Sequence, residues 1–482
     1  MQDSLSWWRG RFLRLVGRAR RARRRSPSKS HVHFPRATAS ARSASAPYLG
    51  LGLIRSWIFC IPFHCFILAS LPAQDALKVE GARIEVTPSP GAQGLLEILD
   101  ASGACVKTLH AGDFSKTRTF TMTPDMLAPG SYRVRYREGL NLAFDTELLL
   151  PKKERWVNPM DIALTSKGVY VLDRGMVPGD IPAKSENAAA AVEQGATCVH
   201  KFTNDGKPDP SFGDRGRATI SEKPCNSILV SVVADDSGNV YIPTLENDVL
   251  VLDPSGTPSS HRIGGADAGA RNTQWAGALT LGPNRLIYIF SGGLCAMSVY
   301  DRAKNGFDGF SHGFKTTRGG TTCRSISSDR QGAIYVTTVT GHLLQKITDS
   351  GKELKETYTT KPEDKMYLPM GPSANGDLVW VADHGPGAGP FWDSGGGGEV
   401  LLFWDNGREL ALVGRYGTPG KAKDKLEFIN PCSTAQTPDH LGLWVVEDGL
   451  PNEDGPPGNA RIRKFKITST RTEEAPLEIK KP

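Results

Sequence analysis

The feature that most constrains the fold of this chain is a short segment repeated six times, a turn followed by an apolar run around one aromatic residue. The copies read GVYV, GNVYI, RLIYI, GAIYV, DLVWV and GLWV, and their aromatic residues are Tyr170, Tyr241, Tyr288, Tyr335, Trp380 and Trp444. These residues are 71, 47, 47, 45 and 64 positions apart. Short strands that recur with a period in the forties are typical of folds that make one four-stranded antiparallel sheet per repeat.

Each repeat continues into a third apolar segment that ends in a polar turn. These segments span Cys198–Gly206, Val249–Gly256, Met297–Gly306, Leu343–Gly351, Val400–Gly407 and Arg461–Ile467. Proline stands just before the expected inner strand in four repeats, at Pro159, Pro224, Pro369 and Pro431. We therefore predict a six-bladed β-propeller over residues 156–467. A ring of seven or eight blades with two unrecognised repeats is the alternative.

The repeat has the pattern NPxxIA, then GxVYVxDxG, then VxVFDxxG, and it resembles the NHL repeat. The resemblance covers about 310 residues in six degenerate copies, and propellers of that family commonly have six blades. The third copy departs most, because it lacks the proline and carries Trp275-Ala276-Gly277 instead. The resemblance implies an NHL-like propeller.

Residues 78–150 precede the repeats and alternate between apolar and polar side chains with a period of two, which predicts strands. The segment LLEILDASGACVKTL, followed by LAPGSYRVRYREG, resembles the small Ig-like sandwich of the flagellar-hook-capping family, which is appended to many bacterial exported proteins. Such modules serve as spacers or adhesive units. The predicted fold class is therefore all-β, an Ig-like sandwich before a propeller, with residues 468–482 as a C-terminal tail.

The positive net charge of the chain comes from its first 57 residues. They hold 13 of the 58 Lys and Arg residues and a single acidic residue, Asp3, in a basic, low-complexity leader. The remaining residues carry 45 basic and 50 acidic side chains. Because binding to nucleic acid needs a basic face on the folded domain, we expect no nucleic acid partner. A basic arm that binds nucleic acid, or a translation start near residue 50, would also account for the leader.

Residues 58–73 resemble the hydrophobic part of a secretory signal peptide, with cleavage near Ala73. The uncharged run Ile58–Leu71 is short for a membrane span, which needs about 20 apolar residues. We expect a monomeric protein that is exported to the periplasm, the cell surface or the medium, with no stable membrane span after processing. An uncleaved anchor is the alternative.

Three of the expected connections between second and third strands are long, and they belong to blades 1, 5 and 6. They span Arg174–Thr197, His384–Gly398 and Gly449–Asn459. These blades are neighbours once a ring closes, and long loops in compact domains are usually functional or disordered. We predict that this face binds a protein, peptide or glycan. The candidate contact residues are Arg174, His384, Phe391, Trp392 and Asp448.

Acidic residues stand at equivalent positions just before these loops. Asp173, Asp383 and Glu447, together with His384, could hold Ca²⁺ or Zn²⁺ or act as an acid–base set. A metal-dependent hydrolase or lyase, similar to propeller lactonases or to NHL-like amidating lyases, is therefore the alternative to a binding protein. The competing interpretation is structural, because acids at such turns commonly accept backbone N–H groups. No catalytic residue follows from the sequence.

Six cysteines remain after the predicted signal segment, and two pairs repeat the same placement between neighbouring blades. Cys198 and Cys225 are 27 positions apart, and Cys295 and Cys323 are 28 apart. This repetition predicts the two disulfides Cys198–Cys225 and Cys295–Cys323. The alternative is a sulfur-lined channel mouth that would suit Cu(I). It would be formed at the starts of inner strands by Met160, Cys323, Met370 and Cys432.

Overall fold

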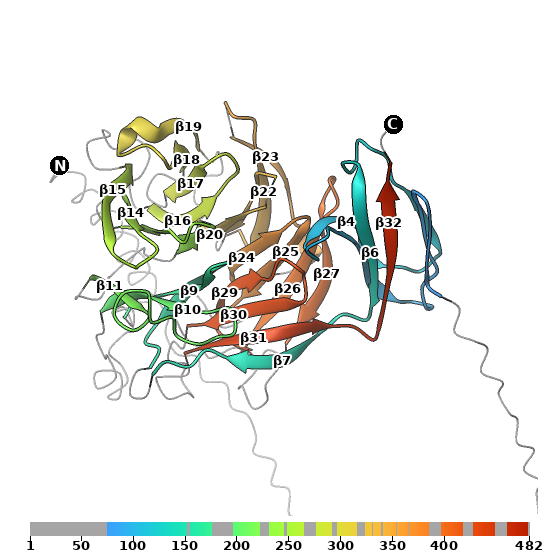
Figure 1. Cartoon of the computed structure of the whole chain (residues 1–482), viewed down its shortest axis with the longest axis horizontal. Coiled ribbons are helices and arrows are strands. Elements are labelled where there is room, and N and C mark those ends of the chain that lie inside the picture. Colours follow the sequence, from blue (N-terminus) through green and yellow to red (C-terminus); the bar gives the residue numbers. More distant parts are fainter. Residues whose placement is uncertain are drawn as a thin grey trace, which may run out of the picture. The chain divides into compact units, whose positions relative to one another are not determined.

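The structure of the chain is a computed structural model, shown in Figure 1. It describes residues 75–151, 155–175, 196–221, 231–244, 248–264, 276–291, 296–315, 323–329, 331–338, 341–352, 354–364, 366–384, 397–417, 428–448 and 460–480. Over these ranges the fold is built from β-strands, with short 3₁₀ turns such as Phe307–Gly309 and Pro362–Asp364. The all-β prediction is confirmed. Within these ranges, no helix has the length and hydropathy that crossing a membrane requires.

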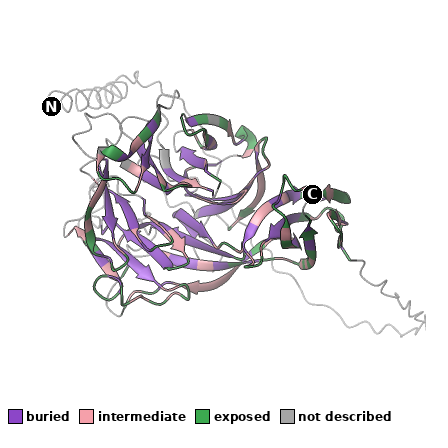
Figure 2. Cartoon of the chain, turned by 45° about the horizontal axis from the view of Figure 1, so that its top comes forward, coloured by how far each residue is buried: buried purple, intermediate pink, exposed green. Residues whose placement is uncertain are grey.

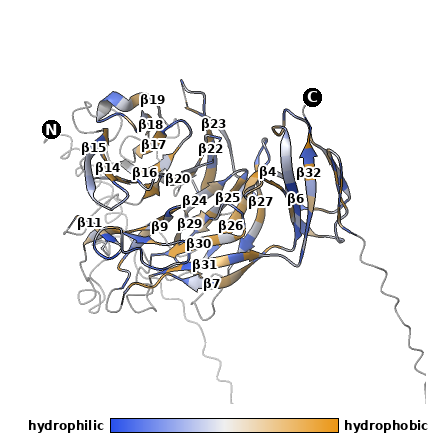
Figure 3. Ribbon diagram, in the orientation of Figure 1, coloured by the Kyte–Doolittle hydropathy of each residue, from blue (hydrophilic) through white to orange (hydrophobic). Residues whose placement is uncertain are grey.

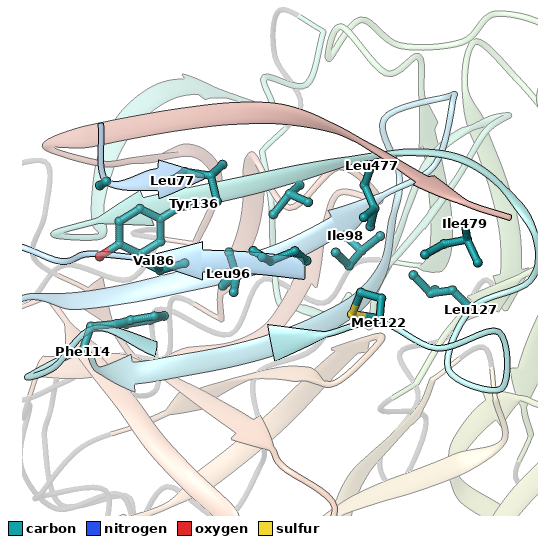
Figure 4. Packing of buried hydrophobic residues seen from close by; sticks show 13 residues of the cluster. Leu77, Val86, Leu96, Ile98, Phe114, Met122, Leu127, Tyr136, Leu477 and Ile479 are labelled. Carbon is teal, nitrogen blue, oxygen red and sulfur yellow. The ribbon is translucent and has the colours of Figure 1, made fainter. Parts of the chain in front are cut away.

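The first six strands of the described chain and its last strand form two sheets. One has the order β1 (Leu77–Glu80), β2 (Arg83–Val86), β5 (Arg118–Thr121), and the other has the order β32 (Arg471–Ile479), β6 (Gly130–Glu138), β3 (Gln93–Leu99), β4 (Cys105–Asp113). Apolar side chains from both sheets make one core, in which Figure 4 labels Leu77, Val86, Leu96, Ile98, Phe114, Met122, Leu127, Tyr136, Leu477 and Ile479. We call this unit the sandwich module.

Six further sheets follow. Blade 1 consists of β8 (Pro159–Thr165), β9 (Gly168–Asp173), β10 (Thr197–Phe202) and β11 (Arg217–Ser221). Blade 2 consists of β12 (Val233–Ala234), β13 (Val240–Pro243), β14 (Asp248–Leu252) and β15 (Pro258–Gly264). Blade 3 consists of β16 (Ala276–Leu281), β17 (Leu286–Ser291), β18 (Ala296–Asp301) and β19 (Phe310–Lys315).

The second half of the ring has the same plan, with one additional strand in blade 5 and a fourth strand in blade 6 that comes from before the propeller. Blade 4 consists of β20 (Cys323–Ser328), β21 (Ala333–Thr338), β22 (Leu343–Asp349) and β23 (Leu354–Thr359). Blade 5 consists of β24 (Pro369–Asn375), β25 (Leu378–Asp383), β26 (Gly397–Asp405) and β27 (Leu410–Tyr416), with β28 (Phe428–Ile429) paired to β26. Blade 6 consists of β29 (Pro431–Gln436), β30 (Gly442–Glu447), β31 (Arg461–Thr468) and β7 (Asn141–Glu147).

The first strands of the six sheets close into a ring. Each of β8, β12, β16, β20, β24 and β29 contacts the next, and β29 contacts β8. The six aromatic segments of the sequence are the second strands of the six sheets, as predicted. Sheets arranged in this way are the blades of a β-propeller. Figure 2 shows buried residues along the strands of the ring.

Second strands are mostly apolar because each lies between two neighbouring blades. Every residue of β9, β25 and β30 is buried, and Figure 3 shows hydrophobic residues along the strands of blades 5 and 6. Aromatic hydroxyls of these strands also reach the next blade. The hydroxyl of Tyr288 donates to Asp349 Oδ2 at 2.8 Å, and that of Tyr335 donates to Asp405 Oδ2 at 2.7 Å. The repeated aromatic residues of blades 3 and 4 therefore bond to the next blade.

Polar side chains of the inner strands make a second set of bonds between blades. Asp161 Oδ2, Ser231 Oγ, Ser327 Oγ and Ser373 Oγ accept from the backbone N–H of Val232, Leu279, Ala374 and Gln436, at 2.8, 3.2, 3.0 and 3.0 Å. Each bond runs from one blade to the next around the central channel. The hydroxyl of Ser433 in blade 6 donates to Asp161 Oδ1 at 2.6 Å, which joins the last blade to the first.

The two units exchange strands, so that β7 and β32 each complete a sheet outside their predicted segment. Strand β7, within the predicted module 78–150, pairs with β31 and completes blade 6. Strand β32, within the predicted tail 468–482, pairs with β6 and completes the larger sheet of the sandwich module. Blade 6 obtains only three strands from the residues after Pro431, so its fourth strand comes from the segment just before the propeller. The alternating pattern of a strand does not specify which sheet accepts it.

Candidate functional site at the base of three loops

Asp173, Asp383 and Glu447 occupy equivalent positions in blades 1, 5 and 6, as the sequence predicts. Each ends a second strand and lies opposite the proline that begins the inner strand, namely Pro159, Pro369 and Pro431. All three acidic side chains are buried. The repeat therefore places three carboxyl groups on the face from which the long connections leave.

Backbone N–H groups donate hydrogen bonds to the carboxylates of Asp173 and Asp383. Asp173 accepts from Val157, Asn158 and Gly175 at 2.9 Å each, and burial raises its pKa. Asp383 accepts from Tyr367 at 2.8 Å and from Leu368 at 2.7 Å. Each acid thus fixes the segment that leads into its own inner strand, the structural role that such acids commonly play.

Glu447 differs from the two aspartates because arginines pair with it. It accepts from the backbone N–H of Ile429 at 2.6 Å, and Arg461 and Arg463 of β31 lie 3.0 and 2.7 Å from its oxygens. Among the described residues, the ligand atoms of the three acids and His384 do not gather within 4.8 Å of one another. Metal binding by these four residues stays a prediction, because their ligand atoms do not form a compact set in the described residues.

The residues that follow the three acids are also equivalent. The backbone N–H groups of Arg174, His384 and Asp448 donate to the carbonyls of Asn158, Leu368 and Asn430, at 3.0, 3.1 and 3.3 Å. All three side chains are buried, with exposed fractions of 6%, 1% and 0%. These positions are therefore fixed by the same backbone geometry in three neighbouring blades.

Two of these residues meet across a blade boundary. His384 Nε2 of blade 5 lies 3.1 Å from Asp448 Oδ2 of blade 6. The other ring nitrogen, His384 Nδ1, has no hydrogen-bond partner among the described residues. A carboxylate at one ring nitrogen favours the tautomer that carries its proton there, which leaves the second nitrogen as an acceptor. The structure thus brings together two of the predicted contact residues, at the start of two long connections.

Several predicted residues lie outside the described ranges. They are Phe391 and Trp392 of the blade 5 connection and Cys225 and Cys295 of the two predicted disulfides. Each predicted disulfide therefore has one member outside the described residues. Of the other members, Cys198 Sγ lies 3.2 Å from His200 Nε2 on the same strand, and Cys323 begins β20. The predicted signal segment, residues 58–73, and the basic leader before it also lie outside these ranges.

The sulfur side chains suggested for a channel mouth are buried. Met160, Met370 and Cys432 have exposed fractions of 3 to 4%, and the Sγ of Cys432 lies 3.5 Å from the carbonyl oxygens of Pro159 and Met160. Met370 and Cys432 belong to one apolar cluster with Ile162. Packing therefore accounts for these residues, as it usually does for methionine and cysteine.

A further His, Cys and acid cluster lies where the sandwich module meets blade 6. Glu97, Cys105 and His440 bring ligand-type atoms within 4.8 Å of one another. Glu97 is fully buried, and His440 Nδ1 and guanidinium nitrogens of Arg135 and Arg137 lie 2.6, 2.9 and 3.0 Å from its oxygens. Burial opposes ionisation of this carboxyl, but these partners outweigh it and lower the pKa of Glu97 to about 2.

This cluster is better described as an ion-pair network than as a metal centre. Two guanidinium groups already neutralise the carboxylate, and a cation beside them would meet their positive charge. Burial raises the pKa of the Cys105 thiol, which disfavours the thiolate that a metal requires. Arg135 and Arg137 also donate to the carbonyls of Asp439 and His440, so the network joins the module to the propeller. Glu97 was not among the residues predicted from the sequence.

The central channel contains a cavity of about 230 Å³. Its lining comes from the inner strands of all six blades and includes Asp161, Thr280, Ser327, Ser373, Thr434 and Gln436. Burial raises the pKa of Asp161 to about 6 although hydrogen bonds from Ser433, Val232 and Ile162 favour the carboxylate. Asp161 was not predicted as a site residue, and its signal was a single acid within the apolar inner segment NPMDIA.

No protein-family model and no curated protein matches this sequence. Solved structures with distant similarity include a streptogramin B lyase, 12% identical with a TM-score of 0.40, over 68% of this chain and 98% of that chain. A virginiamycin B lyase from Staphylococcus aureus is 16% identical with a TM-score of 0.39, over 71% and 90%. The WD40 repeats of RRP9 are 9% identical with a TM-score of 0.41, over 68% and 100%. Similarity at this level carries no functional argument.

Proposed function

We propose that this chain is an exported binding protein whose propeller takes a protein, peptide or glycan ligand on the face formed by blades 5, 6 and 1. The observation that carries the proposal is the His384–Asp448 pair, which joins blades 5 and 6 where two long connections begin. Both side chains are buried, and His384 Nδ1 has no partner among the described residues.

A buried polar atom without a partner costs free energy that a ligand can recover. With Asp448 fixing the proton on Nε2, Nδ1 of His384 accepts a hydrogen bond. The complementary ligand group is therefore a donor, such as a peptide N–H or a sugar O–H. Both groups belong to the ligand classes expected from the loop-rich face.

The test begins with screening the full chain against a peptide array and a glycan array, and measuring the affinity of the strongest hit by calorimetry. We expect His384→Gln to weaken that binding about tenfold, since one buried hydrogen bond is lost. The matched control is His261→Gln in β15 of blade 2, whose imidazole lies 2.9 Å from the carbonyl oxygen of Arg302 in blade 3. Equal affinities of the two variants, at unchanged melting temperature, would contradict the proposal.

The alternative function is a metal-dependent hydrolase or lyase at the same face. Its support is the His384–Asp448 pair, because a carboxylate that orients an imidazole is a common arrangement for proton transfer. Metal analysis of the purified protein tests this alternative. A stoichiometric Ca²⁺ or Zn²⁺ that is lost on Asp383→Ala and Glu447→Ala would favour it over a simple binding protein.

We further infer that the ring is an NHL-type propeller and that the sandwich module is Ig-like. The support is the repeated sequence pattern over residues 156–467 and the two packed sheets that precede it. Export rests on the signal-like residues 58–73. The intact mass of protein recovered from its native host tests export, since cleavage near Ala73 removes the segment before it.

A further inference from the structure

The central channel offers a second place where a ligand could bind, distinct from the loop-rich face. Its cavity of about 230 Å³ is lined by inner-strand residues, and most of their polar groups are already engaged. Asp161 accepts from Ser433, Val232 and Ile162, and Thr280 and Ser328 bond each other at 2.9 Å. Thr434 donates to the Gly371 carbonyl at 3.2 Å. Polar groups that can still bond a ligand therefore lie in one sector of the channel wall.

That sector comprises Ser327, Ser373 and Gln436 in the neighbouring blades 4, 5 and 6. Each serine Oγ accepts one backbone N–H of the next blade, which leaves its hydroxyl proton available to a molecule in the channel. Gln436 is 7% exposed, and its side-chain oxygen is buried without a partner among the described residues. Because Ser373 bonds the backbone of Gln436, these two groups lie side by side.

The charge of the lining decides the class of ligand. None of the described lining residues is Lys, Arg or His, so this part of the lining offers no counter-charge to a phosphate or carboxylate. The single ionisable residue in this described lining is Asp161, whose oxygens already accept hydrogen bonds from three residues. Neutral hydroxyl and amide groups that both donate and accept match an uncharged ligand with several hydroxyls.

We propose that the central channel binds a small uncharged polyol of the monosaccharide class through Ser327, Ser373 and Gln436. The size fits, because the cavity is below the range of about 300–1,000 Å³ that drug-sized ligands occupy and exceeds the roughly 30 Å³ of one water several-fold. The lining also includes the partly exposed residues Ala163, Ala234 and Ala374, which supply apolar surface for C–H groups.

The experiment measures binding of four probes, D-glucose, D-galactose, N-acetylglucosamine and mannitol, to the full chain by saturation-transfer NMR and calorimetry. We expect at least one probe to bind. Gln436→Leu and Ser373→Ala should each weaken this binding about tenfold, because a probe hydroxyl loses its partner. The matched control is Thr280→Val, in the same channel, whose hydroxyl is already bonded to Ser328. Its affinity should stay within about twofold of the wild type.

Three results would overturn the proposal. The first is that none of the four probes binds, which would mean that the channel holds only water. The second is equal affinity in Gln436→Leu and Thr280→Val, with melting temperatures that show both variants to be folded. The third is binding of inorganic phosphate or Ca²⁺ in the channel with no competition from the four probes. Retained binding in His384→Gln would separate this site from the loop-rich face.

Discussion

Asp161 of blade 1 accepts hydrogen bonds from both neighbouring blades, and its burial there disfavours the charged form of its carboxyl. Its carboxylate closes the ring between blades 6 and 1 through Ser433 and continues it through the N–H of Val232. Burial raises the pKa of this carboxyl to about 6 because the charged form is removed from water. The folded protein therefore binds a proton at Asp161 more tightly than the unfolded chain does.

This difference predicts a pH dependence of stability. Because the folded pKa lies above the unfolded one, the contribution of Asp161 is greatest below about pH 4 and is lost as the pH rises towards about 6. Asp161→Asn removes this titration. We expect the free energy of unfolding of the variant, relative to the wild type, to improve by roughly 2 kcal/mol between about pH 4 and pH 7.

Urea denaturation of both proteins at the two pH values measures this change. The carboxyl of Glu97, whose pKa is lowered to about 2, contributes in the opposite direction but is present in both proteins and cancels. A difference between variant and wild type that is the same at both pH values would refute the assignment of the titration to Asp161.

At the scale of single elements, the short strand β32 completes both a sheet and the apolar core of the sandwich module. Its nine residues pair along β6 and place Leu477 and Ile479 in the core of the sandwich module. It also forms an edge of that sheet, where Pro476 and several glutamates discourage pairing with another chain. Residues 471–479 are thus part of a folded unit.

Removal of residues 470–482 should therefore unfold the sandwich module. The deletion exposes the partners of Leu477 and Ile479 and leaves β6 without a neighbour on one side, so we expect hydrogen exchange of β3 and β6 amides to rise by orders of magnitude. Deletion of only the last two residues, 481–482, is the control. Unchanged protection of β3 and β6 in the longer deletion would contradict the strand assignment.

The sequence repeat allowed most strands to be predicted. The exchange of β7 and β32 between the two units could not be predicted from it. A buried aromatic strand such as β9 or β25 carries its own apolar signature, and the acids Asp173 and Asp383 follow from the repeat. By contrast, the pairing of β7 with β31 depends on a vacancy in blade 6 that no local pattern encodes. The same holds for His384 and Asp448, which meet across 64 positions of sequence, and for the channel sector around Gln436.

At the scale of the whole described chain, the sandwich module and the propeller share two exchanged strands and a buried ion network. Glu97 of β3 forms ion pairs with Arg135 and Arg137 of β6 and contacts His440 of blade 6. Because a buried charge without its counter-charge is strongly unfavourable, the network couples the stability of the two units.

Glu97→Gln should lower the free energy of unfolding by roughly 3–5 kcal/mol, since two buried guanidinium groups lose their counter-charge. Calorimetry should show one transition in the wild type and a markedly lower melting temperature in the variant. The control is Glu474→Gln, which breaks the exposed pair with Arg133, and exposed pairs contribute about 0–1 kcal/mol. Equal melting temperatures of Glu97→Gln and Glu474→Gln would show that the network does not contribute to stability.

The exchange of β7 and β32 also sets the order in which the protein can be completed during its synthesis. Strands β3, β4 and β6 leave the ribosome early, but their sheet acquires its last strand only when Ile479 has emerged. Blade 6 likewise waits for β31 to reach β7. Neither unit can therefore close before its last strand, β32 or β31, has been synthesised, although most of its other strands precede that strand by hundreds of residues or lie in other repeats.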